Sequence, residues 1–237
     1  MKISLVIPAY NEEKYIGLCL ESVFKNAPDF FHEIIVIDNA STDKTREVAE
    51  KFKGVKVIHE AQKGLTSARQ KGLESATGDL IAYIDADTKM PKDWGKKVLK
   101  SFSKNPHFVC ISGPYIYHDV KPLKSFSVWL YWHLFAYPTS LLTGYMVVGG
   151  NFIAKKDALE KISGFDKSIA FYGEDTDIAK RLSKVGKVKF MPSLPMYTSA
   201  RRFKGQGTGK TAILYILNFF SVSFRGKPAS KEYTDIR

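Results

Sequence analysis

The chain has 237 residues, a length that suits one α/β catalytic domain with a C-terminal extension and is short for two full domains. Hydrophobic residues make up 44% of the chain and aromatic residues 13%, which excludes a disordered protein. The formal net charge of +12 indicates anionic partners, but no zinc-finger, basic-region or RNA-recognition signature accompanies it, so nucleic acid is not expected among them.

The two cysteines, Cys19 and Cys110, lie in apolar stretches without metal-ligand spacing. This pattern argues against a disulfide scaffold or a zinc site and suits a reducing compartment. The first residues run straight into a strand-like pattern, without a charged segment and a cleavage site. We therefore expect a cytoplasmic protein.

Short β-branched runs alternate with amphipathic helical patterns in the first half of the chain. The runs predicted as strands are residues 3–7, 33–38, 55–59 and 79–85. Asn11 is expected to cap the first helix, the second begins near Ser41 or Thr42, and the third runs from about Gly64 to Ala76. Small residues at four-residue steps, Ala68, Gly72 and Ala76, allow the third helix to sit close to a sheet.

This order predicts an α/β fold, with a mostly parallel central sheet flanked by helices. Ligands bind such sheets at the carboxyl ends of the strands. Three segments are expected together on that rim: residues 8–12, 38–43 and 85–87. All three contain carboxylates.

The second half continues with a helix after Pro91, a strand over 108–112, regular structure over 146–155, a helix opened by Glu174 and Asp175, and a strand over 187–191. A basic loop over 201–210 and an apolar segment over 212–224 follow. We expect a catalytic domain over 1–200 and an appendage associated with the membrane or the acceptor over 201–237.

Residues 125–148 lack charged side chains other than histidine and are rich in aromatic residues. Pro138 argues against a bilayer span, and a span would also separate Asp87 from Asp175. We interpret the segment as an interfacial helix or hairpin. An aromatic core or a dimer interface is the alternative.

Asp85-Ala86-Asp87 follows an apolar strand and carries the clearest chemical signal. Two carboxylates in this arrangement suit a divalent cation that bridges to a diphosphate. Taken alone, such a triplet more often marks a solvated turn, and its position after an apolar strand is what favours a metal site.

Several ordered motifs over residues 2–202 resemble the family 2 glycosyltransferases, which are inverting enzymes with the Rossmann-like GT-A fold. The matching motifs are Ile7-Pro8-Ala9-Tyr10-Asn11-Glu12, the segment 36–45, Gly64 with Ala68-Arg69 and Gly72, Asp85-Ala86-Asp87, and Gly173-Glu174-Asp175. The QxxRW signature of processive members is absent from the chain. The resemblance therefore implies transfer of a single sugar.

The resemblance also implies roles for individual residues. Pro8, Ala9, Tyr10 and Glu12 would form the opening nucleotide-binding segment, and Asp38 would contact the base. Arg69 would lie near the donor, Asp85 would lie toward the ribose, Asp87 would hold the metal, and Ala86 would belong to the nucleotide-sugar site. Gly150 would line the acceptor side of the donor pocket. The glycine pair that contains Gly150 allows close approach of a substrate, although a simple bulge explains it equally well.

An inverting transfer needs a base beside the attacking hydroxyl. Asp175 is the predicted base, with Glu174 in support, although both residues also suit the positive end of a helix dipole. Arg201 and Arg202 are predicted to stabilise the leaving diphosphate. A solvated basic turn or a site for membrane phosphates are the alternatives for these two arginines.

The expected partners are a UDP- or GDP-sugar, Mn²⁺ or Mg²⁺ as cofactor, and a lipid-linked acceptor at the anionic inner face of the cell membrane. A homodimer is a further expectation. A sugar nucleotidyltransferase is the alternative enzyme class, but residues 8–12 lack the glycine-rich loop with an arginine that opens such enzymes. A non-catalytic nucleotide- or membrane-binding module is disfavoured because Asp87 and Asp175 are both present.

Overall fold

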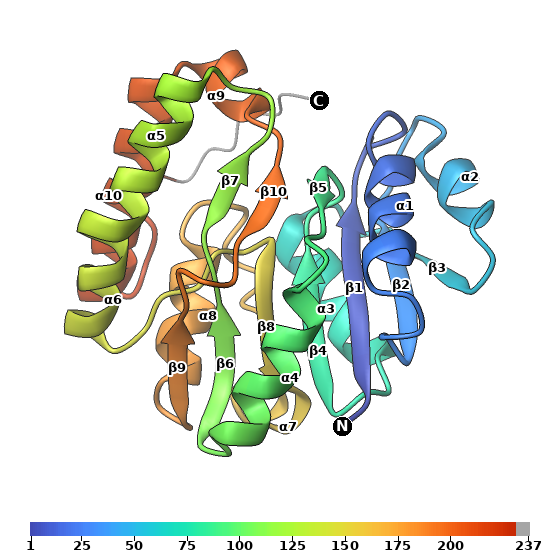
Figure 1. Ribbon diagram of the computed structural model, residues 1–237, viewed down its shortest axis with the longest axis horizontal. Helices are drawn as coiled ribbons and strands as arrows, with labels where there is room; N and C mark the ends of the chain where they lie inside the picture. The colour runs from blue at the N-terminus through green and yellow to red at the C-terminus, as the bar shows by residue number, and fades with distance from the viewer. Residues whose placement is uncertain (231–237) are drawn as a thin grey trace.

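A computed structural model describes residues 1–230 and has a seven-stranded sheet at its centre (Figure 1). The strand order is β3-β2-β1-β4-β8-β6-β9, and β8 alone in this sheet runs antiparallel to its neighbours. The strands are β1 (Ile3–Ala9), β2 (Glu33–Asp38), β3 (Val55–His59), β4 (Leu80–Ile84), β6 (Phe108–Ser112), β8 (Asn151–Lys155) and β9 (Lys187–Phe190). The predicted mostly parallel α/β sheet is confirmed.

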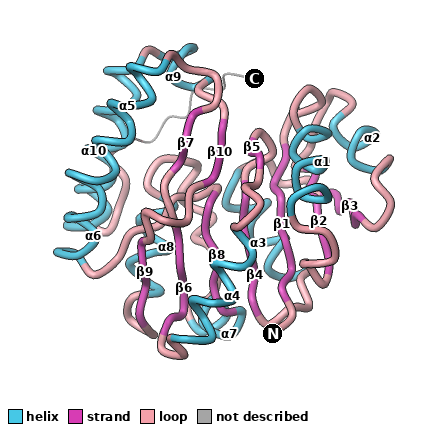
Figure 2. The backbone as a smooth tube through the Cα atoms, viewed as in Figure 1, coloured by secondary structure: helices cyan, strands magenta, loops and turns pink. Residues whose placement is uncertain are grey.

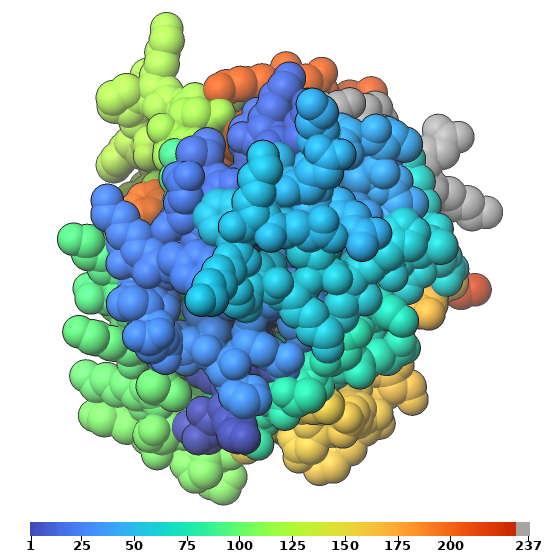
Figure 3. All heavy atoms as spheres, turned by 90° about the vertical axis from the view of Figure 1, so that its right-hand side faces the viewer, coloured from blue at the N-terminus to red at the C-terminus, as the bar shows by residue number. Residues whose placement is uncertain are grey.

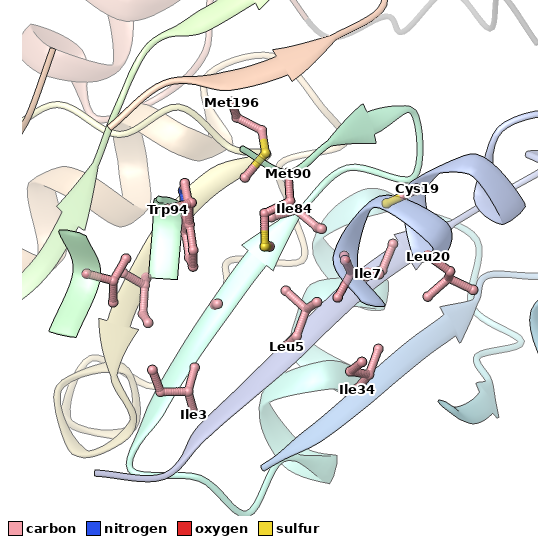
Figure 4. Packing of buried hydrophobic residues seen from close by; sticks show 14 of the residues in the cluster. Ile3, Leu5, Ile7, Cys19, Leu20, Ile34, Ile84, Met90, Trp94 and Met196 are labelled. Carbon is pink, nitrogen blue, oxygen red and sulfur yellow. The ribbon is translucent and has the colours of Figure 1, made fainter. Parts of the chain in front are cut away.

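Helices cover both faces of this sheet (Figure 1). One face carries α1 (Ile16–Asn26), α2 (Thr45–Glu50) and α4 (Trp94–Lys104), and the other carries α3 (Leu65–Ser75), α7 (Lys156–Lys161) and α8 (Glu174–Leu182). Alternate residues of β1 point to the two faces: Leu5 and Ile7 pack in one apolar cluster (Figure 4), and Val6 packs in the other. Each fully buried Leu or Ile side chain stabilises the fold by about 1.5–3 kcal/mol.

The small residues of α3 bring it close to the sheet, as their spacing predicts. A Cβ at Gly72 would lie 2.3 Å from Cγ1 of Val6, so only glycine fits there. This close packing fixes Arg69, one turn earlier on α3, beneath the carboxyl rim of the sheet.

A second sheet of three short strands, in the order β5-β10-β7, lies beyond that rim (Figure 2). Its strands are β5 (Thr88–Lys89), β7 (Tyr115–Tyr117) and β10 (Met196–Thr198). Because β5 follows the Asp-x-Asp triplet and β10 leads to the C-terminal helices, this sheet connects the triplet with the end of the chain.

The aromatic-rich segment is helical. It forms α5 (Pro122–Tyr131), a π-helical turn η1 (Trp132–Ala136) and α6 (Tyr137–Thr143), and α10 (Thr208–Arg225) lies beside them (Figure 1). Among residues 1–230, no helix has both the length and the apolar composition that crossing a bilayer requires. Residues 231–237 of the predicted appendage lie outside the described part of the chain, and the division at residue 200 stays a prediction.

Four local predictions are wrong. Asn11 does not cap α1: its φ is +51°, and its side-chain oxygen accepts a hydrogen bond from the Thr42 amide at 2.8 Å. α2 begins at Thr45, because Asp43 accepts the Thr45 amide at 2.9 Å and holds the preceding residues in a turn. β8 begins only at Asn151, and the basic segment after β10 contains the helix α9 (Arg201–Gln206) instead of a loop.

Candidate active site

The first two predicted segments meet at the carboxyl rim. Ala9 and Asp38 are neighbours in the register of β1 and β2, and the Asn39 amide donates to the Ala9 carbonyl at 2.8 Å. Beyond the strands, the Glu12 amide donates to Oγ1 of Thr45 at 2.6 Å. Pro8 and Ala9 are therefore buried parts of the strand end, and the loops after β1 and β2 form one surface.

Asp38 and Tyr10 lie on this surface with basic partners. The Asp38 carboxylate accepts the Ser41 amide at 3.2 Å and lies 3.2 Å from Nδ1 of His59. Lys63 donates to the Tyr10 hydroxyl at 2.6 Å. Neither His59 nor Lys63 was a predicted site residue, since only the tertiary contact reveals them.

Asp85, the first carboxylate of the triplet, is held from two sides. The Tyr115 hydroxyl donates to its Oδ2 at 2.7 Å, and Nη2 of Arg69 lies 3.4 Å from its Oδ1. Burial, followed by the charge of Asp85, raises the pKa of Tyr115 well above its usual value, so this phenol stays protonated as a donor. Tyr115 was missed as a site residue, and only its position just after a predicted strand could have suggested it.

Arg69 connects the triplet to the acidic motif. Its side chain is only 1% exposed, and it forms an ion pair with Glu174 as well as with Asp85. Burial raises the pKa of Glu174 to about 7, against the opposing effect of Arg69. Two motifs 89 positions apart (174 − 85) thus meet at one guanidinium.

The glycine pair before β8 makes room for these side chains. A Cβ at Gly150 would lie 2.2 Å from Oδ2 of Asp85, and one at Gly149 would lie 2.6 Å from Oε1 of Glu174. This packing explains why both positions are glycine. Close approach of a substrate and a simple bulge are not needed as explanations. The glycines permit the packing of Arg69 with its two carboxylates.

Asp175 is half-buried at the start of α8, where its Oδ1 accepts the Thr176 amide at 2.8 Å. Burial raises its pKa, with Arg69 acting in the opposite direction. Burial raises the pKa of Tyr131 in α5 and of Tyr215 in α10, and the Asp175 charge adds to both shifts. α8 also packs against α10, so the acidic motif faces this C-terminal helix.

Asp87, the second carboxylate of the triplet, is 10% exposed and contacts a cation. Nε of Arg201 lies 2.9 Å from its Oδ2, and Oγ1 of Thr198 lies 3.4 Å from its Oδ1. Ala86, between the two aspartates, is a core residue with 3% exposure.

The two predicted arginines lie in different surroundings. Arg201 lies on the rim, where Nη1 donates to Oε2 of Glu12 at 2.8 Å. The guanidinium of Arg202 instead lies 4.2 Å from the ring centroid of Phe171. Arg201 is thus placed beside the triplet, and Arg202 packs on the loop before α8.

The donor set suits a divalent cation only in part. Within residues 1–230, no group of three or more His, Cys, Asp or Glu side chains is arranged to hold a metal ion. A hard cation needs only one or two protein carboxylates when substrate phosphates supply further oxygens. Asp87 fits that role, because its carboxylate already accepts a cationic group, the Arg201 guanidinium.

The family model for glycosyl transferase family 2 matches residues 4–163. The chain belongs to glycosyl transferase family 2. The match includes both aspartates of the triplet, Arg69 and the glycine pair, whereas the acidic motif and Arg201 lie beyond it. Membership in this family favours a glycosyltransferase over the alternative, a sugar nucleotidyltransferase.

Curated relatives of this family 2 chain match over part of their length. A putative glycosyltransferase of Bacillus subtilis, EpsH, is 37% identical over 103 residues, which cover 42% of this chain and 30% of EpsH. A dolichol-phosphate mannosyltransferase of Pyrococcus furiosus is 32% identical over 120 residues, which cover 49% of this chain and 34% of the relative. The matches thus span about a third of the length of these two relatives.

Solved structures establish the GT-A fold of the family 2 chain. The mannosyltransferase PcManGT of Pyrobaculum calidifontis, in complex with GDP-Man and Mn²⁺, matches with a TM-score of 0.72 and 21% identity, over 94% of this chain and 64% of that one. Glucosyl-3-phosphoglycerate synthase of Mycobacterium tuberculosis, in complex with Mn²⁺, UDP and its product, matches with a TM-score of 0.69 and 19% identity, over 97% and 81%.

Proposed function

We propose that this family 2 glycosyltransferase moves one sugar from a nucleoside-diphosphate sugar to an acceptor hydroxyl or a lipid-linked phosphate, with inversion at the anomeric carbon. The observation that carries the proposal is the Arg69 guanidinium, which contacts Asp85 of the triplet and Glu174 of the acidic motif. The carboxylates proposed for the donor side and for the acceptor side would therefore belong to one site.

The donor would lie along the rim of the sheet. Asp38 would contact the base, Asp85 the ribose, and Asp87 a divalent cation, Mn²⁺ or Mg²⁺, that neutralises the diphosphate. Two similar structures, at 21% and 19% identity, hold GDP-Man with Mn²⁺ and UDP with Mn²⁺, which supports a donor of the UDP or GDP type.

Asp175 would act as the base. In transfer to a hydroxyl, Asp175 accepts the hydroxyl proton as the acceptor oxygen bonds to the anomeric carbon and the bond to the diphosphate breaks. The buried surroundings that raise the pKa of Asp175 also make it a stronger base than an exposed aspartate. Glu174 would keep Arg69 in place between the two motifs.

Calorimetric titration with UDP and GDP tests the donor site. In the presence of Mn²⁺ or Mg²⁺, either UDP or GDP should bind. Asp87→Ala should weaken that binding by at least about tenfold, because a charged contact contributes about 1.4 kcal/mol or more. Asp157→Ala, which changes an exposed carboxylate on α7, is the matched control. Equal affinity with and without metal would remove Asp87 from its metal role.

We further propose that the acceptor is lipid-linked and that the protein is peripheral on the inner face of the cell membrane. Large apolar side chains are exposed along α5, η1, α6 and α10, a surface that we call the apolar helix surface. Its exposed members are Leu123, Phe126, Trp129, Leu130, Tyr131, Leu134, Phe135, Leu141, Leu142, Ile213, Ile216, Leu217, Phe220 and Phe224.

Charge favours an anionic membrane as the partner of this surface. The chain has no acidic residue between Asp119 and Asp157, nor between Asp177 and Glu232, so the helices of the surface carry only basic charges. Each basic residue near an anionic leaflet contributes about 1 kcal/mol. In Figure 3 the lime-coloured residues of α5 project at the upper left, beside the orange residues of α9.

The apolar helix surface also adjoins the acidic motif. A Cβ at Gly173 would lie 2.7 Å from Cγ2 of Val222 in α10, and Lys180 of α8 donates to the Ser223 carbonyl at 2.7 Å. A lipid-linked acceptor held at this surface would therefore bring its head group toward Asp175.

Vesicle sedimentation tests the membrane proposal. The protein should bind vesicles of phosphatidylcholine with phosphatidylglycerol, and lose most of this binding at high salt or after the double change Leu142→Asp and Phe224→Asp. Leu18→Asp, on the exposed side of α1, is the control and should bind normally. The opposite result would be a protein that does not bind vesicles and forms a homodimer, with the double variant monomeric. That result would mean that the apolar helix surface binds a second copy of the chain.

A further inference from the structure

Arg201 bridges two acidic groups that come from different parts of the rim. Its Nε lies 2.9 Å from Oδ2 of Asp87, and its two terminal nitrogens contact the two carboxylate oxygens of Glu12. The guanidinium also lies 4.7 Å from the ring centroid of Tyr15. One side chain of α9 thus holds the loop after β1 and the triplet together.

The bridge meets an electrostatic need. Glu12 is 2% exposed and Asp87 is 10% exposed, so two carboxylates at this depth would be costly without a cation between them. In return, hydrogen bonding to Glu12 and the charge of Asp87 raise the pKa of Arg201 further above its usual value, despite burial. The guanidinium thus shares its single positive charge between the two carboxylates.

The same bridge competes with a metal ion. A divalent cation on Asp87 must approach its carboxylate oxygens, and one of these, Oδ2, already faces Nε of Arg201. A metal that binds Oδ2 therefore requires the guanidinium to leave or shift, which also weakens its contact with the buried Glu12 carboxylate. A diphosphate that arrives with the metal offers the guanidinium a new bidentate partner.

We propose that Arg201 is a resident cation that occupies the place of the metal beside Asp87 and transfers to the donor diphosphate when metal and donor bind together. The proposal rests on the metal role of Asp87 proposed above and adds a coupling to it. Metal alone binds weakly because it must displace the guanidinium, whereas metal with nucleotide binds well because the displaced guanidinium gains the diphosphate.

The local structure allows the movement. Arg201 begins α9, a helix of six residues that is followed by Gly207, where φ is +83° and a Cβ would meet nothing within 4 Å. Asp119 holds the start of α9, accepting the Ala200 amide at 2.7 Å and pairing with Lys204 at 2.8 Å. The Arg201 side chain connects α9 to Glu12 and Asp87, and a metal bound at Asp87 would break the second of these contacts.

Titration with Mn²⁺ alone, followed by electron paramagnetic resonance of the free ion, tests the exchange. Arg201→Gln should bind Mn²⁺ about tenfold more tightly than the wild type, as expected if the guanidinium leaves Asp87 accessible about a tenth of the time. Addition of UDP or GDP should then increase Mn²⁺ affinity less in Arg201→Gln than in the wild type. Lys204→Gln, one turn along the same helix, is the control and should match the wild type in both measurements.

Arg201→Lys tests whether Mn²⁺ binding is limited by the bridge to two carboxylates or only by the positive charge at this position, which would repel the metal. Lysine keeps the charge but cannot hold two carboxylates in the same fork, so Arg201→Lys should resemble Arg201→Gln. Wild-type affinity in Arg201→Lys, or unchanged Mn²⁺ affinity in Arg201→Gln, would overturn the exchange and leave the metal role of Asp87 intact. Failure of every variant to bind Mn²⁺, with or without nucleotide, would overturn both.

Discussion

Asp175→Asn is expected to lower the rate of sugar transfer by at least about a hundredfold while donor binding is retained. The asparagine amide keeps the size of the side chain and can still accept the Thr176 amide at the start of α8, but it cannot take a proton from the acceptor. The measurement is the rate of nucleoside diphosphate release with acceptor present, alongside calorimetric titration of the donor nucleotide.

Asp177→Asn is the matched control for this prediction. Asp177 is on the same helix and pairs with Arg181, away from the acidic pair, so the change should alter stability more than transfer. If Asp175→Asn transfers sugar at the wild-type rate and Glu174→Gln does not, the base is Glu174.

Arg69→Met is expected to destabilise the protein by about 3–5 kcal/mol, the cost of leaving buried charge without its partner. Arg69 is 1% exposed and is the ion-pair partner of Glu174, which is 7% exposed. Urea unfolding at pH 7.5, which lies above the shifted pKa of Glu174, measures the loss. Arg181→Met, which breaks a half-buried ion pair on α8, is the comparison and should cost less.

The cost of Arg69→Met should depend on pH in a set direction. Burial already raises the pKa of Glu174 from 4.5 to about 7, and loss of Arg69 removes the main influence that lowers it. A carboxyl with a raised folded-state pKa stabilises the fold below its unfolded value and loses that contribution as the pH rises through the folded value. Wild type and variant lose this contribution in parallel up to about pH 7, so the deficit of the variant should stay nearly constant up to that pH and increase above it. A deficit that also stays constant above pH 7 would mean that lost packing, and not unpaired charge, destabilises the variant.

The sheet and the position of the rim could be predicted from the sequence because they depend on local patterns. The strands over 33–38 and 55–59 were predicted to the residue, and β4 to within one residue at each end. Strand-helix-strand order then placed Asp38 and Asp85 at the same edge without any long-range information.

Two of the wrong predictions, the Asn11 cap and the loop after β10, share one physical cause, which is competition from tertiary contacts. Asn11 has the sequence context of a helix cap, but it hydrogen-bonds to Thr42 across the rim instead. The segment after β10 contains Gly205 and Gly207, which favour a loop, yet α9 forms where Asp119 and the rim carboxylates hold its first turn.

The connections within the site could not be predicted for the same reason. Tyr115 reaches Asp85 only because β7 joins the second sheet above the rim. Arg201 was predicted as a phosphate ligand, but its bridge from Glu12 to Asp87 joins residues 189 and 114 positions apart (201 − 12 and 201 − 87). Spacing in one sequence gives no information on such contacts.

Crystals grown with Mn²⁺ and UDP or GDP test the central claim most directly, because anomalous scattering locates the metal without assumptions about roles. We expect one Mn²⁺ peak in contact with the Asp87 carboxylate and the diphosphate. The uracil or guanine ring should lie beside Asp38, and the Arg201 guanidinium should have moved from Asp87 to the diphosphate. A nucleotide bound away from this rim, or a metal with no contact to Asp87, would contradict the claim.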